Sequence, residues 1–320
     1  MKKIRVGVIG VGYLGRYHAQ KYAGMDNIDF VGVVDTAKSQ AETVARQVGT
    51  KAYASHLDLM DRVDAVSIAV PTPAHYTVSR DFLENNVDIL IEKPMTASLE
   101  EADELLEIAE SKGLIIQVGH LEEFNPAVVA LREFVKKPMF IESHRLSIYK
   151  DRCTDVSVVL DLMIHDIDII LNLVKSEIKE IRAAGAPVTS GQVDIANARL
   201  EFENGCVANI TASRISTRNE RKLRLFQRDG YLSVDFAKRE ITVINQNSHK
   251  DPSDLIPGME IKQLCFSEGD ALENEIRSFV TAVSSRKVPE VTGQMGRDAL
   301  KVALCIMEQI DNFTQRNLGN

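Results

Sequence analysis

The stretch GVGYLG, residues 10–15, decides the fold class expected for this 320-residue chain. It places Gly10, Gly12 and Gly15 in the spacing G-x-G-x-x-G, after the apolar run of residues 4–9 and before a helix-like segment. In such a loop the first glycine permits a tight turn, the second lets the backbone approach a pyrophosphate, and the third packs the helix on the strand. The start of the helix then faces the phosphate charge. The sequence therefore predicts a dinucleotide-binding βαβ unit.

The residues after the glycine loop indicate which dinucleotide to expect. Asp35 closes the next apolar run, residues 28–35, and follows Gly15 by 20 residues. A carboxylate at this place accepts hydrogen bonds from both ribose hydroxyls of NAD and repels the 2′-phosphate of NADP. We therefore expect NAD as the cofactor, and NADP is the alternative because Lys38 lies nearby.

Strands and helices alternate over the first part of the chain. Apolar runs at 64–70, 87–92 and 114–119 are separated by helix-like segments, and the segment at 98–113 opens on a capping pattern and closes on a glycine. Strands that are apolar throughout and alternate with helices indicate a parallel sheet covered on both faces. The expected fold class of this part is a doubly wound α/β domain.

Two loops follow strands of this sheet at its carboxyl edge, where ligands of such folds bind. They are AVPTPAHY at 69–76 and IEKPM at 91–95. On position alone, Lys93 is equally well interpreted as a chemical group beside the nicotinamide and as an exposed loop lysine. The expected cofactor contacts are Gly10, Gly12, Tyr13, Leu14, Gly15, Asp35, Val70, Pro71, Thr72, His75, Glu92 and Lys93.

The pattern changes in the second half of the chain. The Asn-Pro pair at 125–126 is typical of a helix start. Strand-like runs are joined by Asn-Gly at 204–205 and Asp-Gly at 229–230, and both pairs favour two-residue hairpin turns. These features predict an antiparallel meander with the helix packed on one side.

A chain of this length favours two domains. We expect residues 1–122 to form the NAD(P)-binding domain, and residues 123–320 to form an α+β domain with a mostly antiparallel open sheet and helices on one face. Helical stretches at 270–285 and 294–316 end the chain, and the last is a candidate for packing back on the first domain. The open face of the sheet needs a cover, which the same face of another subunit provides. We therefore expect a homodimer or homotetramer through the C-terminal sheet.

Composition argues against several other classes of protein. The net charge of −8 opposes binding to a polyanionic nucleic acid. No apolar run is long enough to span a membrane, and the apolar start of the chain is short and broken by glycines, so we expect mature protein rather than a signal peptide. Four widely spaced cysteines indicate neither a metal site nor a disulfide framework. We expect a cytoplasmic protein that binds no metal, nucleic acid or membrane.

The stretch VVLDLMIHDIDII, residues 158–170, combines an apolar composition with ionisable residues. In a regular helix Asp161, His165 and Asp168 share one face, and most other positions are apolar. Burying such groups without partners costs several kcal/mol, so they either satisfy one another or line a cavity that a polar molecule enters. The helix alone does not decide between these interpretations. We expect Asp166 and Asp168 to have structural roles.

The ordered motifs GVGYLG, PTPAHY, EKP and D-x-x-x-H, the last within DLMIHDID, resemble those of the glucose-fructose oxidoreductase, inositol dehydrogenase and MocA family (GFO/IDH/MocA) over nearly the whole chain. The resemblance implies a Rossmann domain followed by a mostly antiparallel sheet domain, NAD(P) as cofactor, and a sugar or cyclitol substrate. It also implies a catalytic group formed by Lys93, Asp161 and His165.

These three residue types suit the oxidation of an alcohol. The reaction needs a base within hydrogen-bond reach of the hydroxyl and a donor that stabilises the developing alkoxide. His165 is the expected base, since histidine titrates near neutrality. Asp161 holds the imidazole or a neighbouring hydroxyl, and Lys93 donates to the reacting oxygen. In the competing interpretation His165 is a core histidine satisfied by an aspartate.

The segment GHLEEFNPA at 119–127 and the apolar helix resemble the branch of the family that acts on nucleotide-linked amino sugars, the UDP-N-acetylglucosamine 3-dehydrogenases. One residue departs from the pattern, because relatives commonly carry arginine where this chain has Glu123. The expected substrate contacts are His120, Glu122, Asn125, Arg145 and Tyr149. Candidate cations for a diphosphate are Arg145, Arg152, Arg214, Arg218 and Arg221.

The leading hypothesis is NAD-dependent oxidation of a ring hydroxyl of a nucleotide-linked amino sugar, at C3 of UDP-N-acetylglucosamine. The alternatives are a dehydrogenase of a free sugar or inositol, and a non-catalytic NAD(P)-sensing regulator on the same fold. Retention of Lys93, Asp161 and His165 together argues against the regulator.

Overall fold

The computed structural model describes residues 3–149, 156–228, 230–246, 258–266 and 269–318, with side chains through residue 312. The chain divides into two compact units. The first unit comprises Met1–Leu121 and Asp270–Leu300, and the second comprises Glu122–Gly269 and Lys301–Asn320. Helix α8 (Gly293–Leu318) therefore begins in the first unit and ends in the second. Among the described residues, no helix combines the length and the apolar composition needed to cross a bilayer.

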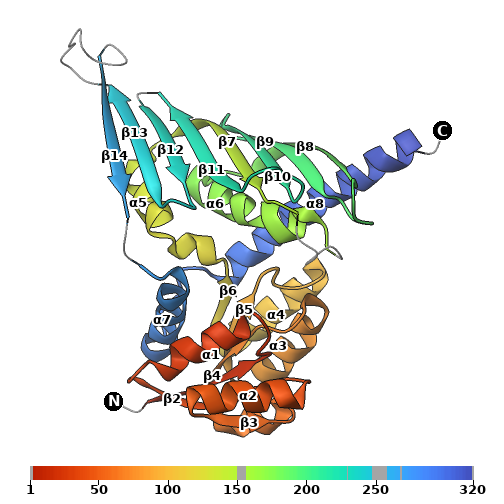
Figure 1. Cartoon of the computed structure of the whole chain (residues 1–320), viewed down its shortest axis with the longest axis vertical. Coiled ribbons are helices and arrows are strands. Elements are labelled where there is room, and N and C mark those ends of the chain that lie inside the picture. The colour runs from red at the N-terminus through yellow and green to blue at the C-terminus, as the bar shows by residue number, and fades with distance from the viewer. Residues whose placement is uncertain (1–2, 150–155, 229, 247–257, 267–268, 319–320) are drawn as a thin grey trace. The chain divides into compact units, whose positions relative to one another are not determined.

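The first unit is built on a parallel six-stranded sheet in the order β3-β2-β1-β4-β5-β6 (Figure 1). Its strands are β1 (Ile4–Ile9), β2 (Ile28–Val34), β3 (Lys51–Tyr53), β4 (Ala65–Ile68), β5 (Asp88–Glu92) and β6 (Ile116–Gly119). Its helices are α1 (Gly15–Ala23), α2 (Lys38–Val48), α3 (His75–Glu84), α4 (Leu99–Lys112), α7 (Ala271–Ser285) and the start of α8. The strand order reverses between β1 and β4, and ligands of open α/β sheets bind at the carboxyl edge beside such a reversal. The doubly wound parallel sheet expected from the sequence is confirmed.

Helix α7 completes the core of this unit from a distant part of the chain. Its Phe279 is completely buried in one apolar cluster with Val6 and Val8 of β1 and Tyr22 of α1. Helices α1 and α7 pack against each other. Side chains on α7 can therefore reach groups on α1, as Glu273 reaches Lys21.

Strand β3 was not expected from the sequence. It has only three residues and pairs in parallel with β2 at the edge of the sheet. Lys51 and Ala52 are exposed, so this strand carries no apolar run that would reveal it.

The second unit contains an eight-stranded sheet in the order β14-β13-β12-β11-β7-β10-β9-β8 (Figure 1). Its strands are β7 (Pro138–Leu146), β8 (Ile178–Ala186), β9 (Ile195–Phe202), β10 (Val207–Ser213), β11 (Glu220–Gln227), β12 (Gly230–Asp235), β13 (Glu240–Gln246) and β14 (Met259–Cys265). Its helices are α5 (Pro126–Phe134), α6 (Ile164–Val174) and the later part of α8. All three lie on the same face of the sheet, and Gln309 of α8 bonds the backbone of β8.

The mostly antiparallel sheet expected from the sequence is confirmed, but its strands do not form one continuous meander. Among the described strands, β7 and β10 pair in parallel, whereas the other neighbours in this sheet run antiparallel. Strand β7 precedes α6 in the chain and lies between β11 and β10 in the sheet. These pairings join segments that are far apart in the sequence, and no local turn motif predicts them. The hairpin expected at 204–205 is confirmed, since it joins β9 to β10 with Gly205 at φ +84°. Asp229 lies outside the described residues, and the strands on either side of it pair antiparallel.

Strand β7 shows how the sheet divides its two faces. Ile141, Ser143 and Arg145 are buried, and the residues between them are partly exposed. Arg145 bonds Asp166 of α6, so the buried residues face the helices. The opposite face carries the partly exposed side chains, and the described helices of the unit leave it open (Figure 1).

Candidate active site

The glycine loop joins β1 to α1 and leaves room for a ligand at one position. Gly10 has φ +80°, and a Cβ there would lie 2.6 Å from the carbonyl oxygen of Ala69. A Cβ at Gly15 would lie 1.7 Å from the carbonyl oxygen of Gly10, so close packing excludes any side chain at both positions. At Gly12, by contrast, no described atom lies within 4 Å of an added Cβ. The backbone at Gly12 therefore offers open space of the kind that a pyrophosphate needs.

Asp35 braces this loop from the end of β2. Its Oδ2 accepts a hydrogen bond from the backbone N–H of Val11 at 2.8 Å, and its Oδ1 accepts one from Ala37 at 2.9 Å. Gln40 of α2 donates to the carbonyl oxygen of Val11 at 2.8 Å. Asp35 stays partly exposed, and each carboxylate oxygen has a second lone pair. The carboxylate can therefore hold the loop and still accept hydrogen bonds from ribose hydroxyls.

Tyr13 and Leu14, which lie in the same loop, point toward solvent. Their side chains are 59% and 41% exposed, and Tyr13 makes an edge contact with Tyr17 of α1. The guanidinium of Arg16 lies 5.2 Å from the centre of the Tyr13 ring. Because these large side chains are exposed next to the open backbone at Gly12, they could cover a dinucleotide bound there.

His75 ties together the two loops at the carboxyl edge of the sheet. Its Nε2 lies 2.8 Å from the carbonyl oxygen of Val70, and its Nδ1 lies 2.9 Å from that of Pro94. A carbonyl only accepts, so both contacts are hydrogen bonds only when the ring carries two protons. The ring is 1% exposed. His75 thus supports the cofactor edge from within, whereas Val70, Pro71 and Thr72 lie at least partly at the surface.

Lys93 and His120 follow neighbouring strands, β5 and β6. Lys93 is partly buried, and His120 is 1% exposed. Burial, and in smaller part the nearby charge of Lys93, lowers the pKa of His120 to about 3. At neutral pH His120 is therefore a neutral ring beside a cationic lysine, which gives this edge one charge and one uncharged hydrogen-bonding group.

The carboxylate of Glu92, an expected cofactor contact, faces helix α1. Its Oε1 lies 3.1 Å from Nε2 of His18 on α1. His18 did not stand out in the sequence, because a histidine in the middle of an amphipathic helix carries no motif.

Asp161 and His165 lie where a π-helical turn (Val159–Met163) passes into α6. Both are partly exposed, whereas the neighbouring Val159, Met163 and Ile164 are completely buried. Only this edge of the apolar segment reaches the surface with ionisable groups.

Asp168 does not share that exposed edge, contrary to the regular helical period. It is 1% exposed and accepts a hydrogen bond from Asn172 at 3.3 Å. Burial raises its pKa to about 8, against the opposing charge of Arg132. The π-helical turn changes the angular offset between Asp161 and the residues of α6 that follow it.

Arg145 is held in a network of buried charges. Its guanidinium donates two hydrogen bonds to Asp166, at 2.8 and 3.1 Å, and one to Glu122 at 2.9 Å. Asn125 also donates to Glu122, at 3.1 Å. Burial works in the opposite direction, but the charge of Arg145 holds the pKa of Glu122 below its usual value. Three of the five expected substrate residues therefore bind one another, and two carboxylates neutralise Arg145.

The other expected cations differ in exposure. Arg214 is 5% exposed and lies 3.7 Å from Asp194. Arg221 and Arg218 have 54% and 75% of their side chains exposed. Arg152 lies outside the described residues. Tyr149, an expected substrate contact, is 40% exposed.

Glu123 forms its contacts with residues inside the second unit. It is 1% exposed, pairs with Arg132 of α5, and accepts a hydrogen bond from Asn172 of α6 at 2.7 Å. Glu123 is therefore paired with a cation on the neighbouring helix. Glu123 ties the 3₁₀ turn Leu121–Phe124 to α5 and α6.

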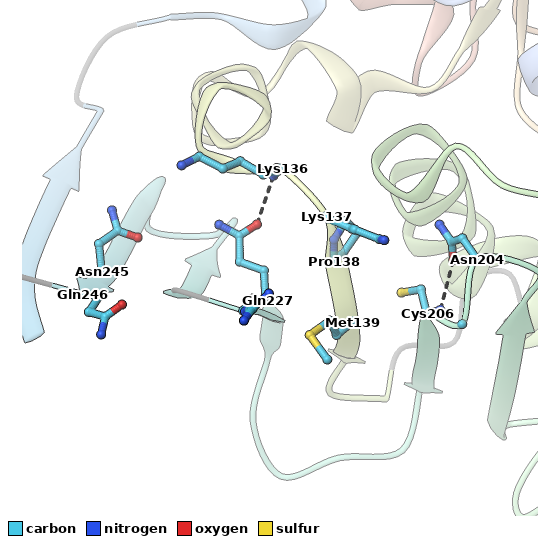
Figure 2. A pocket seen from close by; sticks show the side chains of 11 residues that line it. Lys136, Lys137, Pro138, Met139, Asn204, Cys206, Gln227, Asn245 and Gln246 are labelled. Atoms are coloured by element: carbon cyan, nitrogen blue, oxygen red, sulfur yellow. Dashed lines mark hydrogen bonds between the residues drawn. The ribbon is translucent and has the colours of Figure 1, made fainter.

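A hollow of about 770 Å³ opens at one end of the eight-stranded sheet. Figure 2 shows lysine and amide side chains around it, with the backbone N–H of Lys136 donating to Gln227 and that of Cys206 donating to Asn204. It is lined by Lys136, Lys137, Pro138, Met139, Asn204, Gly205, Cys206, Gln227, Arg228, Asn245 and Gln246. None of the expected site residues lines this hollow.

Two family models match the chain. Residues 4–120 match the GFO/IDH/MocA oxidoreductase family with an NAD-binding Rossmann fold, and residues 135–233 match the GFO/IDH/MocA C-terminal domain. The UDP-N-acetylglucosamine 3-dehydrogenase of Acidithiobacillus ferrooxidans is 37% identical over 317 residues, which cover 99% of this chain and 100% of that protein. A solved structure of that enzyme has a TM-score of 0.93, covering 98% of this chain and 100% of its own.

More distant relatives act on cyclitols. The scyllo-inositol 2-dehydrogenase (NAD(+)) of Bacillus subtilis is 27% identical over 91% of this chain and 89% of its own length. A structure of scyllo-inositol dehydrogenase from Lactobacillus casei with bound NAD(H) and scyllo-inositol has a TM-score of 0.81 at 18% identity, covering 97% of this chain and 98% of its own. At that identity the likeness is one of fold.

Proposed function

Because the chain belongs to the GFO/IDH/MocA family of NAD-binding oxidoreductases, we propose that it is a dehydrogenase that oxidises a ring hydroxyl of UDP-N-acetylglucosamine, at C3. The choice of substrate rests on one observation, the likeness along 99% of this chain to an enzyme named for that reaction. NAD fits the residues present, since Gly12 leaves open space for a pyrophosphate and Asp35 can accept from both ribose hydroxyls.

The proposed mechanism divides the removal of hydrogen between cofactor and protein. A bound NAD would supply the acceptor for the hydride that leaves the carbon bearing the hydroxyl. His165 accepts the hydroxyl proton, and Asp161 in the preceding turn orients the imidazole. Lys93 donates a hydrogen bond to the oxygen as negative charge develops on it. His120, being neutral, contacts the sugar without adding a second charge beside Lys93.

The diphosphate of the substrate needs cations that are not already neutralised. Arg145 is bound by two carboxylates, and Arg214 is buried beside another. Arg218 and Arg221 each lie near one carboxylate, Glu220 at 2.9 Å and Glu122 at 3.6 Å, but both side chains are largely exposed. Each guanidinium therefore keeps further donors at the surface, which supports these two residues as the diphosphate contacts among the described arginines of the expected series.

The test is turnover by purified protein. NADH formation is measured with UDP-N-acetylglucosamine, UDP-N-acetylgalactosamine, glucose, myo-inositol and scyllo-inositol, each with NAD or NADP, and the product is examined by NMR for the position of the new carbonyl. We expect a 3-keto product from UDP-N-acetylglucosamine with NAD. Turnover of a free inositol but of no nucleotide sugar would instead establish the cyclitol alternative. Binding of NAD without turnover of any of the five would favour the regulator.

We also propose that the protein is a cytoplasmic homodimer or homotetramer. The open face of the eight-stranded sheet carries an aromatic cluster, in which the Phe226 ring lies 5.9 Å from Phe140 and 4.9 Å from Tyr231. A second copy of this face would cover these rings. Light scattering at micromolar concentration tests this, and a monomer would contradict it.

Free thiols at Cys206, Cys265 and Cys305 support a reducing compartment.

A further inference from the structure

Three ionisable side chains meet in the interior of the first unit. They are His18 on α1, Glu92 at the end of β5 and Glu275 on α7, and each offers a nitrogen or oxygen atom within 4.8 Å of the others. His18 and Glu275 are each 1% exposed, and the Glu92 side chain is 12% exposed. Lys93 follows Glu92 directly in the chain.

The carboxyl group of Glu275 lacks the partners that a buried anion requires. Among the described residues, neither of its oxygens takes part in a hydrogen bond, and none of the described ion pairs includes it. Two carboxylates this close together in a protein interior repel each other, and neither is solvated well enough to offset the repulsion. Burial, and then the charge of Glu92, raises the pKa of Glu275 well above its usual value.

The groups around the cluster also favour an uncharged Glu275. Tyr22 of α1 bonds Ser67 of β4 at 2.8 Å, and burial keeps its hydroxyl protonated. Gln117 of β6 donates to the backbone carbonyl of Glu275 at 2.9 Å rather than to its carboxyl group. The acidic residues at the start of α7, Asp270 and Glu273, bond Lys21 at the surface and so direct that cation away from the cluster.

Glu92 is enclosed on the side away from these two partners. A Cβ at Gly119 of β6 would lie 3.0 Å from Glu92 Oε2, so the carboxyl group fills the space that a side chain would occupy. Its Oε1 faces Nε2 of His18. The position of Glu92 is therefore determined by β6 on one side and by hydrogen-bonding partners on the other.

We propose that Glu275 and Glu92 share one proton, that with His18 they form a single buried hydrogen-bonded cluster, and that this cluster positions Lys93. The Glu275 hydroxyl donates to the carboxylate of Glu92, and the Nε2–H of His18 donates to Oε1 of the same carboxylate. A rotation about the side-chain torsions of glutamate closes the remaining gap. Glu275 is a positioning residue, because it acts on Lys93 through Glu92. The role of Lys93 rests on the proposed function, whereas the shared proton does not.

The shared proton is tested by the melting temperature of the cofactor-free protein as a function of pH. A carboxyl group whose pKa is raised on folding costs stability as pH rises above the ordinary glutamate value of about 4.3, until it ionises in the folded state. Glu275→Gln keeps the shape and carries no proton to lose. We expect its melting temperature to rise relative to wild type between about pH 5 and pH 8. The control Glu110→Gln replaces an exposed residue of α4 and should give a constant difference.

Two results would overturn the shared proton. One is a Glu275→Gln protein whose melting temperature differs from wild type by the same amount at every pH, because a carboxylate that is ionised in the folded protein gives no such trend. The other is one equivalent of zinc or manganese in the purified protein by elemental mass spectrometry. Imidazole and carboxylates are ligands of both metals, and a metal would hold both glutamates ionised.

The positioning role is tested by steady-state kinetics with NAD and UDP-N-acetylglucosamine. Glu275→Leu removes the donor to Glu92, and we expect kcat to fall about tenfold while the KM for NAD stays near wild type, as for a small misplacement of a catalytic group. Glu275→Gln restores a donor and should recover most of this loss. Equal kcat values for Glu275→Leu and wild type would overturn the role. If wild type turns over no sugar, the proposed function fails, and the melting data still decide on the shared proton.

Discussion

Substitution of Asp35 separates the ribose contacts from the support of the glycine loop. The carboxylate accepts two backbone N–H groups, from Val11 and Ala37, and is expected to accept two ribose hydroxyls when NAD is bound. Asp35→Ala removes all four hydrogen bonds. The loss of loop support weakens NAD and NADP alike, whereas the loss of ribose contacts weakens NAD alone, since NADP carries a 2′-phosphate that the carboxylate repels.

The expected size follows from the hydrogen bonds involved. A hydrogen bond to a charged group contributes about 1.5 kcal/mol at the lower end of its range, so two ribose contacts contribute about 3 kcal/mol. At about 1.4 kcal/mol for each factor of ten, the ratio of NADP to NAD dissociation constants should fall about 100-fold. Relief of the repulsion with the 2′-phosphate would enlarge this change.

The assay is a titration of the protein with NADH and NADPH, followed by cofactor fluorescence. Asp26→Ala, which replaces an exposed aspartate of the same unit, is the matched control and should leave both affinities unchanged. Melting temperatures without cofactor report the loss of loop support separately. Equal losses of affinity for both cofactors would refute the assignment of Asp35 to the ribose.

Three further predictions concern the catalytic group and the buried charges. Lys93→Met and His165→Ala should each lower kcat by a factor of about 10² to 10⁴ with little change in NAD affinity. The kcat of the double variant should be scarcely lower than that of the worse single variant. Full additivity of the two losses in kcat would contradict a shared role. Arg145→Met should destabilise by about 3–5 kcal/mol in urea unfolding, because it leaves Asp166 buried without its cation, and adding Asp166→Leu should recover part of the loss. Asp194→Ala should destabilise by about 2–4 kcal/mol at neutral pH, since the backbone N–H groups of residues 188–190 lose their acceptor. Burial raises the pKa of Asp194, but hydrogen bonds from residues 188–190 outweigh burial and hold this pKa well below its usual value. The difference between Asp194→Ala and wild type should therefore shrink as pH falls below about 4, and a difference that is constant with pH would contradict the reasoning.

The features that sequence reasoning predicted correctly are those encoded within a few residues. The glycine spacing at 10–15, the helix at 98–113 and the Asn-Gly turn at 204–205 each act on the backbone locally. Strand β7 and its parallel pairing with β10 depend instead on which distant segments meet. The same limit applies to the candidate site, whose loop residues belong to motifs, whereas His18 and Glu275 are brought to Glu92 by helices separated by some 250 residues of chain.

The apolar segment 158–170 illustrates why charge alone is a poor guide to a binding site. Asp166 lies on a helix that faces the sheet, and Arg145 lies at an inward position of β7, in register with the buried Ile141 and Ser143. Each residue alone contradicts the apolar pattern of its own element, and each therefore resembles a ligand contact. Together they form a two-bond ion pair that satisfies both. Alternation along β7 already marks Arg145 as inward, and a buried arginine requires an acid opposite it. An unexpected charge on one amphipathic element is thus better read first as the partner of an unexpected charge on another, and as a ligand contact only where it reaches the surface.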